Sequence, residues 1–143
     1  MRIIIKNNYD SVSYWTASYI KNKIMQHIDS HIVLGLPTGS TPLSVYRYLI
    51  DFYNKNELTF KHVITFNMDE YVGLDQSHPQ SYHHFMFENF FNHIDIIHSN
   101  IHILNGTSEN LQQECINFEH NIQQHGGIDL MLGGIGTCLL YTS

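Results

Sequence analysis

Cysteine and positively charged side chains are both scarce in this sequence. The 143 residues include two cysteines and seven lysines and arginines, against thirteen aspartates and glutamates. Cys115 and Cys138 are too few for a disulfide framework and form no C-x-x-C pair, so we expect a reducing, cytoplasmic compartment. The formal net charge of −6 argues against a nucleic-acid partner or an anionic membrane surface, because both need clustered cations.

The sequence also lacks a long hydrophobic run. Lys6 and Asn7 end the apolar start of the chain before the core of a signal peptide can form. No run approaches the roughly 20 residues of a membrane span. Hydrophobic residues still make up 43% of the chain, which is enough for a folded core. The length suits one domain.

Strand and helix patterns alternate along the chain. Short apolar runs predict strands at 2–6, 32–36, 60–66, 101–104 and 128–132. Apolar residues at helical spacing predict the intervening helices, with caps at Asp10 or Ser11, Thr41, Ser81 and Ser108. This alternation is typical of a three-layer α/β fold, in which helices cover both faces of a mostly parallel sheet.

For two of the predicted helices, the apolar spacing also predicts which side chains are buried. In the first helix, one face should pack into the core through Val12, Trp15, Tyr19, Ile20, Ile24 and Ile28. In the last, the buried stripe should be Leu111, Cys115, Phe118 and Ile122. Cys115 is therefore expected to be a packing residue.

The loop after the strand at 32–36 is rich in glycine and hydroxyl side chains. Thr38, Gly39, Ser40 and Thr41 precede Pro42, which suits the first position of a helix. Backbone N–H groups at a helix start attract anions, and the helix dipole favours negative charge there. A phosphate site and an ordinary strand–helix turn are both consistent with these residues. The loop is neither a Walker A motif nor a G-x-G-x-x-G motif.

Two carboxylates, Asp69 and Glu70, follow the strand at 60–66. Ligands of open α/β sheets bind beyond the carboxyl ends of the strands, where a carboxylate can move a proton to or from carbon. Alternatively, the pair belongs to a solvated turn that caps a helix. A third loop, the glycine turn Gly133–Gly136, follows the last strand. Because parallel strands end at one edge, the three loops can converge, which favours an enzyme.

The chain resembles the N-terminal half of the glucosamine-6-phosphate deaminase family. Three stretches carry most of the resemblance: 34–42, 65–74 and the His-Pro-x-Ser-Tyr segment at 78–82. Asn105-Gly106 and 132–136 also fit. The first loop is shared with 6-phosphogluconolactonases, whereas the acidic loop and the 78–82 segment are similar to the deaminases specifically.

The resemblance implies a Rossmann-like fold, incomplete at its C-terminal side, and a reaction without a cofactor or metal. Glucosamine 6-phosphate and water would give fructose 6-phosphate and ammonia. Asp69 matches the base that moves a proton from C2 to C1, and Glu70 matches a neighbouring acid that orients Asp69 or contacts the substrate. Thr38, Gly39, Ser40 and Thr41 match the phosphate loop. The complete protein would act on a small sugar phosphate and form a homo-oligomer.

The sequence departs from the family after Gly136. The family continues with Asp-Gly-His and then Asn-Glu-Pro, whose histidine opens the sugar ring with the help of the two acids. Here Cys138 stands at the position of the aspartate, and no counterpart of the histidine follows. We therefore expect residues 1–136 to be part of one deaminase domain, 137–143 to be an aberrant tail, and this chain alone to be inactive.

Two other functions remain open at this point. One is a sugar-phosphate binding module without catalysis, which the absence of a DNA-binding helix pair disfavours as a regulator. The other is a lactonase of the same fold, which the acidic loop disfavours. A metal site is not expected, because no histidine pair has a third ligand at suitable spacing.

Overall fold

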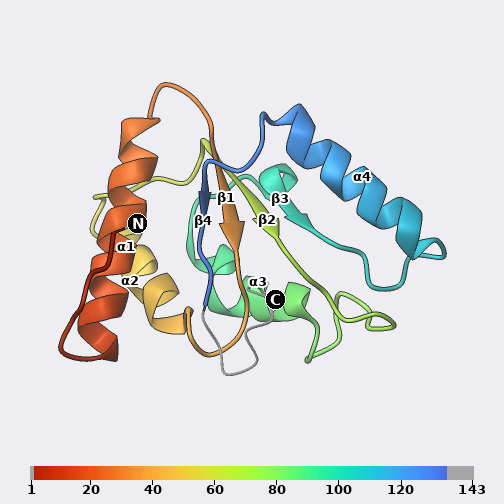
Figure 1. Ribbon diagram of the computed structural model, residues 1–143, viewed down its shortest axis with the longest axis horizontal. Helices are drawn as coiled ribbons and strands as arrows, with labels where there is room; N and C mark the ends of the chain where they lie inside the picture. The colour runs from red at the N-terminus through yellow and green to blue at the C-terminus, as the bar shows by residue number, and fades with distance from the viewer. Residues whose placement is uncertain (1, 135–143) are drawn as a thin grey trace.

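A four-stranded parallel sheet forms the centre of the molecule (Figure 1). The computed structural model describes residues 2–134. The strands are β1 (Ile32–Leu36), β2 (Val63–Asn67), β3 (Ile101–Ile103) and β4 (Leu130–Met131). They lie in the order β3-β2-β1-β4. All residues of β1 and β2 are buried, which explains why these strands show no polar alternation.

Three helices contribute to the larger of two hydrophobic cores: α1 (Tyr9–Gln26), α2 (Leu43–Asn54) and α3 (Tyr82–Asn89). On the sheet side, this core includes Ile32, Leu34 and Leu36 of β1. Two short 3-10 helices, η1 (Phe91–His93) and η2 (His98–Asn100), follow α3. The aromatic residues at the end of α3 complete the core, as the ring of Phe90 stacks on Tyr46 with centroids 4.7 Å apart.

Helix α4 (Leu111–Gln124) covers the other face of the sheet. Its Phe118 and Ile122 pack against Val33, Ile64 and Phe66, which form the smaller core. In Figure 1, α4 lies on the opposite side of the sheet from α1 and α2. The structure therefore confirms the predicted parallel α/β fold with helices on both faces.

The predicted first strand is wrong. Residues 2–6 have no strand structure, and the side chains of Ile3 and Ile5 are 72% and 89% exposed. An apolar, β-branched run has the propensity for a strand but becomes one only beside a hydrogen-bonding partner. Among the described residues, no strand lies beside this segment.

Three of the predicted helix caps are also wrong. Helix α1 begins after Asn8, whose side chain accepts from the amide of Ser11 in a capping box, instead of at Asp10 or Ser11. Pro42 occupies the cap position of α2 in place of Thr41, and Asn110 caps α4 in place of Ser108. Ser81 caps α3 as predicted, accepting from the amide of His84. Asx and Ser/Thr side chains stand close together at these starts, so sequence alone does not choose between them.

The helix stripes are only partly as predicted. In α1, Ile20 and Ile24 are buried, whereas Val12 and Tyr19 are exposed. Ile28 is also exposed and lies beyond the end of α1 at Gln26. In α4, Leu111 is 39% exposed and Cys115 is exposed, so Cys115 is not the packing residue that the spacing predicted. The reason is that α4 contacts the sheet mainly through its C-terminal half, at Phe118 and Ile122.

Several boundaries shift by a few residues. Strand β2 includes Asn67 and begins at Val63, β3 ends at Ile103, and β4 is shorter than predicted. No helix within residues 2–134 is long and apolar enough to cross a membrane. The predicted glycine turn is described only as far as Gly134, and residues 135–143, including Gly136 and Cys138, lie outside the described residues.

Candidate active site

Two loops, and the described start of a third at Gly133 and Gly134, lie at the carboxyl edge of the sheet. Strand β1 pairs with β2 on one side and with β4 on the other, always in parallel, so the loops that follow these strands are neighbours. In Figure 1, the arrowheads of β1 and β2 point to the same end of the molecule. A Cβ atom placed on Gly134 would lie 3.8 Å from the Thr41 side chain, which puts Gly134 beside the first loop.

The first loop, Pro37–Thr41, connects β1 to α2. Gly39 has a φ angle of +92°, a left-handed conformation that favours glycine. Within residues 2–134, the amide groups of Thr38, Gly39, Ser40 and Thr41 donate to no backbone acceptor. Unpaired amides beside a helix start are suited to an anion such as phosphate. We call this segment the anion loop.

The acidic loop, Met68–Leu74, follows β2. Asp69 is half-buried and lies close enough to Tyr82 for its charge to raise the pKa of that phenol. It lies two residues beyond the end of β2, and β2 pairs with β1, the strand that leads into the anion loop. The structure therefore brings the predicted base and the predicted phosphate loop to one edge of the sheet, while their chemical roles stay predictions.

Glu70 differs from Asp69 in its surroundings. Its Oε1 accepts from the amides of Tyr71 and Tyr82, both at 2.8 Å, and its Oε2 accepts from the amide of His83 at 2.9 Å. Both carboxylate oxygens are thus bound to the backbone, at the start of α3. This arrangement ties the acidic loop to that helix, as a charged side chain at a helix N-terminus does.

Tyr82 joins the two loops, a role that the sequence analysis did not assign. Its hydroxyl donates to that of Tyr71 at 3.2 Å, and the Thr38 side chain lies close enough to influence its pKa. The bond with Tyr71, followed by burial and the Asp69 charge, raises the pKa of Tyr82 to about 12, although Thr38 opposes this rise. The phenol therefore keeps its proton at neutral pH. The sequence signal for Tyr82 was its position directly after Ser81, the predicted helix cap.

The turn at Gly106 supports the acidic loop from the β3 side. The carbonyl of Gly106 accepts from the amide of Gly73 at 2.8 Å. A Cβ atom at position 106 would lie 2.1 Å from the carbonyl oxygen of Tyr71, which is far inside van der Waals contact. The sequence indicated a turn here but not its contact with the acidic loop.

Histidines do not gather around either loop as a metal site would require. Residues 2–134 contain no group of three histidine, cysteine or carboxylate side chains that could hold a metal ion. His83 stacks on Phe87, and burial, the largest influence, lowers its pKa below the ordinary value. The polar groups placed at the sheet edge are therefore amides, hydroxyls and carboxylates.

A loop of backbone amides beside a carboxylate, at the carboxyl edge of a parallel α/β sheet, is an arrangement that suits a small phosphorylated ligand. The family model described as glucosamine-6-phosphate isomerases/6-phosphogluconolactonase matches residues 7–137. The chain belongs to this family.

Within this family, the chain is similar to proteins named glucosamine-6-phosphate deaminase. A glucosamine-6-phosphate deaminase from Treponema denticola is 58% identical over 139 residues, which cover 95% of this chain and 52% of that protein. The human glucosamine-6-phosphate deaminase 2 is 55% identical, with 95% and 50% covered. The chain thus spans about half the length of these relatives.

Solved structures match in the same region. A monomeric glucosamine-6-phosphate deaminase matches with a TM-score of 0.91 and 37% identity, covering 95% of this chain and 56% of that one. A 6-phosphogluconolactonase from Thermotoga maritima matches with a TM-score of 0.71 and 19% identity, covering 90% and 56%. At that identity, the second match shows the shared fold alone.

Proposed function

We propose that the protein to which this chain belongs converts glucosamine 6-phosphate and water into fructose 6-phosphate and ammonia. The observation that carries the proposal is the position of Asp69, a half-buried carboxylate two residues beyond the end of β2, which pairs with the strand that leads into the anion loop. The relatives that are 55–58% identical are named glucosamine-6-phosphate deaminases, which supports the same substrate.

The proposed chemistry needs only these groups and water after the sugar ring has opened. The phosphate would bind at Thr38, Gly39, Ser40 and Thr41, which fixes the position of the sugar chain. Asp69 would take the proton from C2 and return it to C1, while one proton of the amine passes to O1, so that C2 is oxidised to an imine and the C1 aldehyde is reduced to an alcohol. The resulting imine at C2 adds water and releases ammonia. Because the redox change is internal to the sugar, no cofactor is required.

Glu70 is proposed as a positioning residue for this step. Its carboxylate is occupied by the backbone amides of Tyr71, Tyr82 and His83, so its proposed role is to hold the acidic loop in place. Of the two roles expected for it, orientation of Asp69 is the one that these contacts support.

We propose that residues 1–136 are the N-terminal part of a single deaminase domain. We also propose that these residues do not supply the groups that open the sugar ring. In the family resemblance, that step belongs to a motif after Gly136, where this sequence has Cys138 and a departing tail. The 143 residues alone are then expected to lack activity. A cytoplasmic location and a homo-oligomer are further proposals, the first resting on the cysteine usage and the second on the family resemblance.

The test is product analysis with the polypeptide that the complete reading frame encodes. We expect equal amounts of fructose 6-phosphate and ammonia from glucosamine 6-phosphate, and no faster hydrolysis of 6-phosphogluconolactone than in buffer. Lactone hydrolysis without ammonia release would replace the proposal with the lactonase. Tight binding of glucosamine 6-phosphate without turnover, in a protein that contains the ring-opening motif, would replace it with a binding module.

A further inference from the structure

Side chains from other parts of the fold hold the carbonyl groups of the anion loop. The phenol of Tyr46 donates to the carbonyl of Pro37 at 2.5 Å. The phenol of Tyr9 donates to the carbonyl of Thr41 at 2.6 Å and lies 3.2 Å from that of Ser40. One residue earlier, the Asn67 amide of β2 donates to the carbonyl of Leu36 at 3.1 Å.

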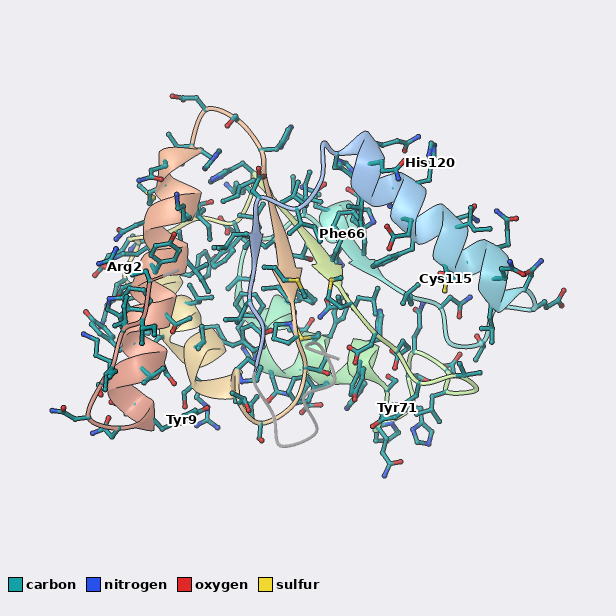
Figure 2. All side chains as sticks on the ribbon, viewed as in Figure 1. Arg2, Tyr9, Phe66, Tyr71, Cys115 and His120 are labelled. Carbon is teal, nitrogen blue, oxygen red and sulfur yellow. The ribbon has the colours of Figure 1, made fainter. Side chains whose placement is uncertain are left out.

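These donors are themselves held firmly. The side chains of Tyr46 and Asn67 are fully buried, and the Tyr46 ring stacks on Phe90. Tyr9 is half-exposed, but it is the first residue of α1, directly after the Asn8 cap. In Figure 2, Tyr9 and Tyr71 of the acidic loop both lie along the lower edge of the molecule, Tyr9 on the left and Tyr71 on the right. The anion loop is thus fixed from α1, α2 and β2 together.

Fixing a carbonyl also fixes the next amide, because the peptide unit is planar and the C=O and N–H groups of a trans peptide point in opposite directions. The carbonyl of Pro37 shares its peptide unit with the amide of Thr38, and the carbonyl of Ser40 shares its unit with the amide of Thr41. Tyr46 and Tyr9 therefore set the directions of two amides that donate to no backbone acceptor within residues 2–134.

We propose that Tyr46 and Tyr9 are positioning residues for anion binding: they hold the carbonyl side of the loop so that its amides face the phosphate of the ligand. The inference rests on the proposed function, since it assumes a phosphate ligand at this loop. Neither phenol touches the ligand. Each acts through the loop, by removing the cost of ordering the backbone when the anion binds.

The experiment compares the binding of inorganic phosphate to the wild-type protein and to Tyr46→Phe and Tyr9→Phe, by calorimetry, in the polypeptide of the complete reading frame. Tyr46→Phe should raise Kd about fivefold, the ratio expected for one hydrogen bond of ordinary net strength. Tyr9→Phe should raise it about twofold, because water can reach the carbonyls that it leaves. With glucosamine 6-phosphate as substrate, KM should rise in the same order while kcat stays constant.

Tyr48→Phe is the matched control. Its phenol also links α1 and α2, by donating to Asp10 at 2.6 Å, but within residues 2–134 it forms no hydrogen bond with the anion loop. Phosphate affinity should therefore not change in this variant. The thermal midpoint without phosphate is measured for all variants, because a purely structural role would lower it and leave the phosphate Kd of the folded protein unchanged.

The outcomes separate the inference from the proposed function. If the wild-type protein binds phosphate and both loop variants bind it equally well, the inference is overturned while the proposed function stands. If Tyr46→Phe does not fold, Tyr9→Phe alone decides, and an unchanged Kd overturns the inference. If the wild-type protein binds no phosphate, the anion site is wrong and both proposals fail.

Discussion

Replacing Gly106 with alanine should displace the acidic loop. The new Cβ atom would lie 2.1 Å from the carbonyl oxygen of Tyr71, so one of the two segments must move by about 1 Å to restore contact. That carbonyl belongs to backbone, which cannot rotate away as a flexible side chain can. The movement would also break the hydrogen bond from the amide of Gly73 to the carbonyl of Gly106.

The expected magnitude follows from these two effects. Forcing an extra methyl group into a packed site costs about 1–3 kcal/mol, and one lost hydrogen bond adds about 1 kcal/mol. We therefore expect Gly106→Ala to lower the free energy of unfolding by about 2–4 kcal/mol. Because Asp69 lies in the displaced loop, a shift of about 1 Å should also cost roughly 100-fold in kcat.

Denaturant unfolding and steady-state kinetics of the complete protein measure both effects. Glu109→Ala is the control, since Glu109 is exposed and lies three residues further along the same connection. Its stability and activity should be unchanged. If Gly106→Ala is as stable and as active as the wild-type protein, then Gly106 does not support the acidic loop and the reasoning from the close contact is wrong.

Two further predictions concern the surroundings of the site. Burial, followed by the neighbouring His125, lowers the pKa of His102 below its ordinary value of 6.5. As the pH falls, His102 therefore takes up its proton at a higher pH in the unfolded chain than in the folded one. The free energy of unfolding should then fall as pH drops below about 6.5. This pH dependence should weaken in His102→Asn but persist in the exposed control His31→Asn. If both variants show the same pH dependence, His102 is not its source. Glu70→Ala should remove the backbone contacts at the start of α3 and cost about 1–2 kcal/mol in denaturant unfolding. Glu88→Ala, at an exposed ion pair, should cost at most about 1 kcal/mol, and equal losses would refute the capping role.

The order of the strands in the sheet determines where the candidate site lies. Much of this arrangement could be predicted from the sequence. Uniformly apolar runs identified β1 and β2 because both strands are buried on both faces. Parallel pairing then requires Thr38–Thr41 and Asp69 to meet at one edge. The predictions were wrong where the structure of a segment depends on a pairing or packing partner. Residues 2–6 have strand propensity without a pairing partner, and the start of α4 has helical spacing without a surface to pack against.

The contacts that organise the site were beyond sequence reasoning. Nothing in the pattern distinguishes Glu70, whose carboxylate binds backbone amides, from Asp69, whose charge acts on the phenol of Tyr82. The same holds for Tyr82 and Gly106, whose roles depend on segments more than ten residues away in the chain. Such contacts are set by tertiary packing, whereas local residue patterns report mainly propensity and burial.

The most direct test of the account is the turnover of glucosamine 6-phosphate by Asp69→Asn in the polypeptide of the complete reading frame. Asparagine keeps the size of the side chain but cannot accept the C2 proton, so kcat should fall by about 100- to 10,000-fold while the thermal midpoint stays unchanged. Asp75→Asn, at an exposed carboxylate six residues further on, should retain full activity. A loss of less than tenfold in Asp69→Asn would contradict the assignment of Asp69 as the base and, with it, the proposed mechanism.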